Sequence, residues 1–137
     1  MLTKTIEYED FNGEMRKEKF YFNLTEAEAA EIEMSTDGGL SEMIQRIVNA
    51  QEVPSIIRVF KDIILKAYGE KSDDGKRFMK VKDGRNLSED FAATNAYSVL
   101  FMELATDPQK AADFFNSIIP GAKNKTPDTV KAENSNE

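Results

Sequence analysis

The stretch from Pro54 to Gly69 constrains the fold more than any other part of the chain. Its apolar residues recur at the i, i+1, i+4, i+7, i+8 and i+11 spacing of one wide helical face. They are Ile56, Ile57, Phe60, Ile63, Ile64 and Ala67. Proline is favoured in the first turn of a helix and glycine after its last turn. The pattern predicts a helix over 54–68 whose apolar face must be covered by other elements.

The N-terminal residues alternate between polar and apolar types, as strands do. Residues 2–23 predict a β-hairpin with Asn12-Gly13 at its turn, because both residue types accept positive φ. A two-residue loop would put Ile6 and Phe20 on opposite faces. A loop with an odd number of residues, such as three residues from Asn12 with a bulge at the glycine, would pair Ile6 with Phe20 and form one apolar face. We predict the odd loop and a face made of Ile6, Tyr8, Phe20 and Phe22.

Capping residues and helical spacing predict four further helices. Thr25 and Glu28 form a capping box, and Asp37-Gly38-Gly39 ends the helix that it starts. Later helices are predicted to start at serine caps or at a cap followed by proline. The caps are Ser41, Ser88 and Asp107-Pro108. The predicted helices span about 25–36, 41–51, 54–68, 88–106 and 108–119.

The remaining segments are polar and lack periodicity. Residues 70–87 predict a long loop with a short strand at Phe78–Val81, and residues 121–137 predict a disordered polar tail. The expected fold class is α+β, mostly α. One domain over 1–120 has an N-terminal β-hairpin packed on a bundle of about five helices.

Composition excludes several kinds of chemistry. The chain has no cysteine and no histidine, which removes disulfides, zinc ribbons, thiol catalysis and the usual general base. Asp73-Asp74-Gly75 could begin a calcium loop, but the twelfth position is Gly84 where a glutamate is needed. We therefore predict turns at Asp73–Gly75 and Asp83–Arg85, no metal or cofactor, and no enzymatic activity.

The sequence also lacks signals for export. The longest apolar runs are a few residues long, whereas a membrane span needs about 20. The first residues lack the apolar core of a secretory signal. We expect no membrane association and a cytoplasmic location.

A basic cluster suggests an alternative function. Five cations surround Phe78, namely Lys76, Arg77, Lys80, Lys82 and Arg85. Basic residues around an aromatic side chain are typical of nucleic-acid contacts. However, the formal net charge of −7 repels phosphate backbones, so nucleic-acid binding is not expected. A nucleic-acid-binding regulator that uses the 76–85 loop stays as the alternative, and an oxygen-ligand metal enzyme is a weaker one.

The last two predicted helices hold more apolar residues than one core face needs. The helix over 88–106 is apolar on more than one side, and Phe114-Phe115 and Ile118-Ile119 precede the polar tail. Surplus apolar surface marks contacts with a partner or between copies, whereas complete burial would make it ordinary core. Both interpretations are open at this point.

Several segments in order resemble one family. They are Phe20–Glu28 (FYFNLTEAE), Gly38–Glu42 (GGLSE), Phe60–Gly69 (FKDIILKAYG), Ser72–Phe78 (SDDGKRF), Ala96–Asp107 (AYSVLFMELATD), and Ala111–Phe115 with Ile118–Pro120. Over about residues 1–120 the chain resembles the tail assembly chaperone of long-tailed, siphovirus-type phages and prophages of Gram-positive bacteria. None of these segments is a catalytic signature.

The resemblance implies a function and partners. Such chaperones bind the tape measure protein and keep it soluble while the tail tube polymerises in the host bacterial cytoplasm, and they are absent from the mature virion. The major tail protein and a second copy are further candidate partners, and a tail structural subunit is another alternative function. A groove for an amphipathic tape-measure helix would need apolar helix faces. We predict that Phe101, Leu104, Phe114, Phe115, Ile118 and Ile119 bind the partner.

Overall fold

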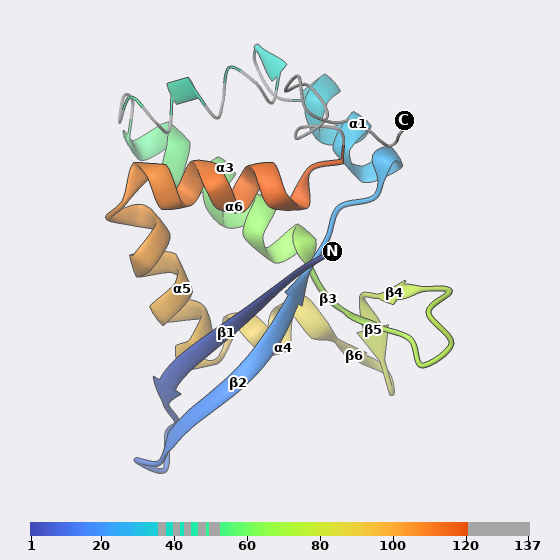
Figure 1. The fold of residues 1–137 in the computed structure, drawn as a ribbon, viewed down its shortest axis with the longest axis vertical. Coiled ribbons are helices and arrows are strands. Elements are labelled where there is room, and N and C mark those ends of the chain that lie inside the picture. The colour runs from blue at the N-terminus through green and yellow to red at the C-terminus, as the bar shows by residue number, and fades with distance from the viewer. Residues whose placement is uncertain (36–37, 40–41, 43–44, 47–48, 50–52, 121–137) are drawn as a thin grey trace.

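A computed structural model describes residues 1–120 except 36–37, 40–41, 43–44, 47–48 and 50–52 (Figure 1). An antiparallel hairpin lies against a helical body, which confirms the predicted α+β class with an N-terminal hairpin packed on helices. The described part of the chain contains five helices. They are α1 (Glu26–Ser35), α3 (Val53–Ala67), α4 (Leu87–Ala92), α5 (Asn95–Ala105) and α6 (Pro108–Ile118). The helix predicted over 41–51 lies mostly outside the described residues.

The hairpin consists of β1 (Leu2–Glu9) and β2 (Met15–Phe22). Its loop has an odd number of residues, and Ile6, Tyr8, Phe20 and Phe22 are all buried, as predicted. The predicted pairing of Ile6 with Phe20 is wrong, because Ile6 pairs with Glu18 and Lys4 with Phe20. The register shifts because residues 10–14 form the loop, which the Asp10 backbone N–H closes by donating to the Glu14 carbonyl at 2.8 Å.

Part of the predicted long loop is in fact a continuation of the sheet. β3 (Tyr68–Lys71) pairs with β2, and β4 (Phe78–Met79) pairs with β3, giving the strand order β1-β2-β3-β4. β5 (Val81–Lys82) and β6 (Arg85–Asn86) form a separate small hairpin. The short strand predicted at Phe78–Val81 is confirmed in part, since Phe78–Met79 and Val81 are in strands. The prediction of a loop is wrong at both ends of 70–87, because β3 pairs with β2 and β6 pairs with β5.

Gly69 was predicted to end the helix, but it lies within strand β3. Tyr68 already belongs to β3, so the helix predicted over 54–68 ends at Ala67. A Cβ atom at Gly69 would lie 2.6 Å from the Met79 carbonyl oxygen and 2.8 Å from the Phe78 ring. Glycine is thus required by the close approach of β3 and β4.

The helix predicted over 88–106 is two helices. Thr94 accepts a hydrogen bond from the Tyr97 backbone N–H and starts α5, while Ala93 ends α4. The predicted Ser88 cap is also wrong, because the Asn86 side chain caps α4 and the Ser88 hydroxyl donates to the Leu65 carbonyl. The break turns the chain so that both α4 and α5 bury an apolar face.

Two predicted caps are confirmed. The Thr25 backbone N–H donates to Glu28 Oε1 at 2.9 Å, and the Glu28 backbone N–H donates to Thr25 Oγ1 at 3.2 Å, which completes the capping box. The Asp107 side chain accepts from two backbone N–H groups at the start of α6, with Pro108 in the first turn.

An aromatic cluster joins the hairpin to the helices. The Phe91 ring of α4 stacks on Tyr68, with centroids 4.3 Å apart, and lies 5.2 Å from Phe20 and 5.7 Å from Phe22. Phe22 also contacts Phe114 of α6 at 5.3 Å. The core therefore lies between the inner face of the hairpin and helices α3 to α6, and α1 adds Ala29 and Ile32 to it.

The buried phenol of Tyr68 predicts a loss of stability at alkaline pH. Burial, with nearby Glu70 and Asp90, raises the pKa of Tyr68 to about 12, above the value of about 10 for an unfolded chain. Because the folded-state pKa is the higher one, the stabilisation is present below about pH 10 and is lost as the pH rises through about 12. Urea unfolding midpoints should fall more steeply for the wild type than for Tyr68→Phe between about pH 9 and 12. Equal slopes would contradict this prediction, and the other tyrosines are common to both proteins.

Candidate partner-binding surface

Most residues of the predicted partner-binding set lie in the core. Five of the six are nearly inaccessible, and Phe101 is half-buried. The five are Leu104, Phe114, Phe115, Ile118 and Ile119. Phe115 contacts Phe60 of α3 with ring centroids 5.3 Å apart, and Phe101 contacts the same ring at 5.5 Å. In the described structure these side chains do not together line one groove, because most of them pack against the apolar faces of the hairpin and α3. Whether any of them contacts a partner stays a prediction.

Helix α5 does expose surplus apolar surface, but on residues outside the predicted partner-binding set. α5 buries Ala96, Leu100 and Leu104 on one face. On the opposite face Val99 is 39% exposed and Met102 is 54% exposed. We call this the α5 outer face, formed by Ser98, Val99, Met102, Ala105 and Thr106, all of them exposed. It has no charged residue, although 31% of the chain is charged. A helix that is apolar on two sides can bury one side in the core and use the other to contact a partner.

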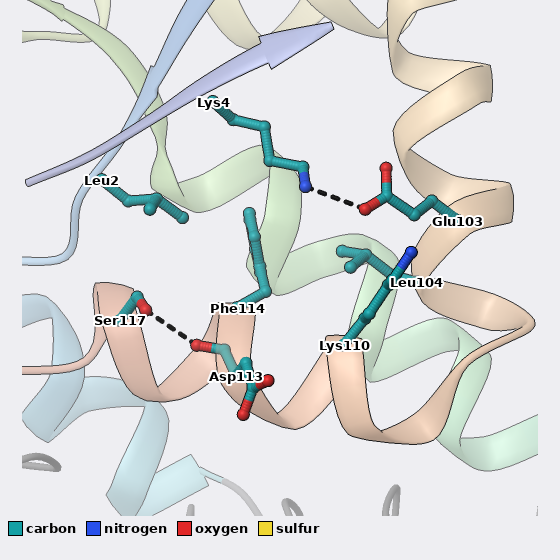
Figure 2. A pocket seen from close by; sticks show the side chains of 8 residues that line it. All are labelled: Leu2, Lys4, Glu103, Leu104, Lys110, Asp113, Phe114 and Ser117. Carbon is teal, nitrogen blue, oxygen red and sulfur yellow. Dashed lines mark hydrogen bonds and ion pairs between the residues drawn. The ribbon is translucent and has the colours of Figure 1, made fainter.

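A pocket lies beside the C-terminal half of the same helix (Figure 2). Its volume is about 250 Å³, and β1, α5 and α6 form its walls. Leu2, Leu104 and Phe114 provide the apolar lining. The polar rim consists of Lys4, Glu103, Lys110, Asp113 and Ser117. Two residues of the predicted set, Leu104 and Phe114, thus reach a hollow at the surface. The sequence did not predict Leu2 or the polar rim as part of a site, because the start of β1 and helix α6 come together only in the folded chain.

One ion pair joins two walls of the pocket, and two hydrogen bonds at its rim lie within α6. Lys4 Nζ on β1 pairs with Glu103 Oε2 on α5 at 2.9 Å. The Ser117 hydroxyl donates to the Asp113 carbonyl at 2.8 Å. Gln109 Nε2 donates to Asp113 Oδ1 at 3.0 Å. The pocket is therefore a formed feature of the monomer with an apolar base and a charged edge.

The basic cluster is largely occupied by contacts within the chain. Lys80 Nζ donates to the Lys66 and Tyr68 carbonyls at 2.6 and 3.1 Å, and burial lowers the pKa of Lys80. Lys82 pairs with Glu70 at 3.1 Å, and Arg85 makes two hydrogen bonds to Asp90 at 2.7 and 2.8 Å. Three of the five cations thus have structural partners, which does not favour a nucleic-acid interface.

The acidic turns of the same segment are structural. Asp74 Oδ1 accepts from the Ser72 hydroxyl at 2.7 Å and from the Lys76 backbone N–H at 3.0 Å, and these contacts lower the pKa of Asp74. Asp83 and Gly84 both have positive φ, as a tight hairpin turn requires. Within the residues that the structure describes, no group of three or more acidic side chains is placed to hold a metal ion. No described helix is long and apolar enough to cross a membrane.

A comparison with protein families decides the classification. The model of the phage tail assembly chaperone family matches residues 1–136. The chain belongs to this family. The match confirms the resemblance found in the sequence segments and covers the hairpin, the helices and the pocket alike. No curated protein matches the chain significantly, and no solved structure matches it either.

Membership of the tail assembly chaperone family directs attention to protein contacts. The family is not a known class of enzymes, and its members serve the assembly of phage tails. The α5 outer face and the pocket are therefore the features of this chaperone that merit testing as contact surfaces.

Two substitutions on α5 should separate its core face from its outer face. Leu104→Asp would place an unpaired charge in the core and lower the free energy of unfolding by more than about 3 kcal/mol. Met102→Asp, two residues earlier and 54% exposed, should change it by less than about 1 kcal/mol. Urea denaturation followed by circular dichroism measures both values. Similar losses in the two variants would show that Met102 is also part of the core.

Proposed function

We propose that this tail assembly chaperone binds the tape measure protein and keeps it soluble while the tail tube polymerises. The observation that supports the proposal most is the uncharged α5 outer face on a protein of that family. A long helical client exposes apolar stripes until the tube encloses it. A chaperone must cover such stripes and must itself remain soluble.

The α5 outer face has the length and chemistry for a helix contact. α5 has 11 residues, so the face extends over about 16 Å, or three helical turns. Val99 and Met102 supply apolar contact area, and Met102 can adapt to clients of different shape. Ser98 and Ala105 are small and would let a client helix approach closely. An amphipathic client helix would bury its apolar stripe here.

The net charge meets the second requirement, which is that the chaperone itself remains soluble. The chain carries a formal charge of −7, and this charge lies outside the α5 outer face. A complex of chaperone and client would therefore present an acidic exterior, which opposes aggregation. Phe101 borders the outer face, since Ala105 follows it by one helical turn. It is the member of the predicted set best placed to contact a client without unfolding of the core.

Co-expression with the tape measure protein of the same phage or prophage tests the proposal. The wild-type chain should move the tape measure protein from the insoluble to the soluble fraction and co-purify with it. Val99→Asp with Met102→Asp should weaken co-purification at least about tenfold, because two charges would be buried against the client. Met34→Asp with Val81→Asp is the matched control, since both side chains are exposed but lie on α1 and β5. Unchanged binding by the folded α5 variant would move the client site elsewhere.

The presence or absence of the protein in finished phage particles distinguishes the chaperone from a structural subunit of the tail, which is the remaining alternative. The proposal expects the chain in the host cytoplasm during assembly and not in purified virions. Mass spectrometry of purified particles should find the major tail protein but not this chain. Its presence there in amounts comparable with tail proteins would instead favour a structural subunit.

A further inference from the structure

The first strand forms an open edge of the sheet. In the strand order β1-β2-β3-β4, β1 has a neighbouring strand on one side only. It is 8 residues long and pairs with β2 in one continuous register, so neither a proline nor a bulge interrupts it. Proteins usually shorten, interrupt or cover such an edge, because its free backbone groups can pair with another strand. β1 therefore keeps the capacity to accept one more strand.

Alternate residues of β1 direct their backbone groups away from β2. The Asp10 N–H donates to the Glu14 carbonyl, so these two residues form a hydrogen-bonded pair of the antiparallel ladder. Such pairs recur at every second position, which assigns the even positions of β1 to β2. The odd positions point their N–H and C=O groups outward. They are Thr3, Thr5, Glu7 and Glu9.

One hydrogen bond supports this orientation and shows where the free edge ends. Asn95 Nδ2 of α5 donates to the outward carbonyl of Glu9 at 2.9 Å. Among the residues that the structure describes, nothing bonds to the outward backbone groups of Thr3, Thr5 and Glu7. All three residues are exposed. The edge over 3–7 thus offers three N–H donors and three C=O acceptors to another strand.

The pocket between β1, α5 and α6 adjoins the inner side of this edge. Its β1 wall consists of Leu2 and Lys4, which alternate with the free positions and extend toward the helices in Figure 2. An added strand continues the pleat of the sheet, so its residues beside Leu2 and Lys4 would also point inward. The volume of about 250 Å³ exceeds the ~150 Å³ apolar cavity that accepts benzene in an engineered protein. One apolar side chain of the added strand therefore fits.

The rim of the pocket carries an unpaired positive charge. Glu103 is neutralised by Lys4 at 2.9 Å. Figure 2 shows the Asp113 carboxylate directed away from Phe114, and this carboxylate accepts a hydrogen bond from Gln109. Lys110 has no ion-pair partner in the described part of the chain. An acidic side chain placed opposite Lys4 would lie between two cations of the rim.

The other end of the free edge is acidic. Glu7 lies on the outer face of the hairpin, and its ion pair with Lys17 is long, at 3.8 Å, and exposed to solvent. Opposite charges directly across a ladder stabilise the pairing of two strands. A basic residue therefore suits the position opposite Glu7.

We propose that β1 accepts an extended segment of another protein as an added antiparallel strand. The segment carries a basic residue opposite Glu7, an acidic residue opposite Lys4 and an apolar residue opposite Leu2 that enters the pocket. In strand addition the main-chain hydrogen bonds give affinity and the side-chain pockets give specificity. Antiparallel pairing is the more stable arrangement. The inference goes beyond the proposed function and does not rest on it, because it concerns β1 and an extended partner.

A synthetic peptide tests the contact with the full chain. The probe is acetyl-Thr-Lys-Thr-Thr-Glu-Thr-Leu-Thr-amide, and the control has the same residues in reverse order. The probe should bind at millimolar concentration, and the reversed peptide should bind at least about tenfold more weakly, because it matches the side chains only as a parallel strand. In nuclear magnetic resonance spectra the amide protons of Thr3, Thr5 and Glu7 should shift downfield as they become hydrogen-bonded. Those of Lys4 and Ile6, already bonded to β2, should shift less.

Backbone methylation of the probe tests the hydrogen bonds without altering the protein. In the proposed register the peptide N–H opposite Thr5 points toward β1, and the next one, opposite Lys4, points to solvent. Methylation of the first nitrogen should lower the affinity at least about tenfold, because it removes one donor and leaves the Thr5 carbonyl unsatisfied. Methylation of the second is the matched control and should change the affinity by less than about twofold.

Two substitutions in the protein test the same contact from the other side. Thr5→Pro removes the outward N–H and leaves the ladder with β2 intact, because proline is tolerated where a strand N–H faces solvent. It should weaken probe binding at least about tenfold, whereas Thr5→Val keeps the N–H and should bind like the wild type. Lys110→Glu should weaken binding, and a probe with lysine in place of its glutamate should restore it.

Several results would overturn the inference. They are a wild type that does not bind the probe at millimolar concentration, binding that leaves the amide protons of Thr3, Thr5 and Glu7 unshifted, and equal effects of the two methylations. Slow hydrogen exchange of these three amides in the protein alone would also overturn it, because the edge would then already be covered by the chain itself or by a second copy.

Discussion

The contact between the hairpin and Phe91 determines how the rest of the chain can pack. A two-stranded hairpin with one apolar face is barely stable in water, so Phe20 and Phe22 need a surface that covers them. Phe91 on the short helix α4 supplies it together with Tyr68 of β3, which stacks on Phe91 and also contacts Phe20 and Phe22. Because β3 also pairs with β2, this cluster ties the strands to the end of α3.

Packing of the core explains why most of the predicted partner-binding residues are buried. Once Phe91 covers one part of the hairpin, α6 has to cover the rest and also α3. Phe114 reaches Phe22, and Phe115 reaches Phe60. The apolar residues of α6 are therefore used within the monomer, whereas α5 keeps Val99 and Met102 exposed to solvent.

The proposed function requires a protein of this size to be soluble and still able to bind apolar surface. The structure separates these properties in space. Charge is spread over the hairpin, α1 and the 70–90 region, whereas the α5 outer face, the pocket lining and the hairpin tip expose apolar atoms in small areas. Small areas favour weak contacts that can be released again.

Local signals in the sequence were enough to predict the hairpin face, the odd loop, the Thr25–Glu28 capping box and the start of α6 at Asp107. They are sufficient because strand alternation and helix capping depend on residues that are close along the chain. The pairing of β3 with β2, the break at Thr94 and the burial of Phe115 were not predictable in this way. Periodicity tells which residues share a face, but which faces meet is set by contacts between distant segments that compete for the same core.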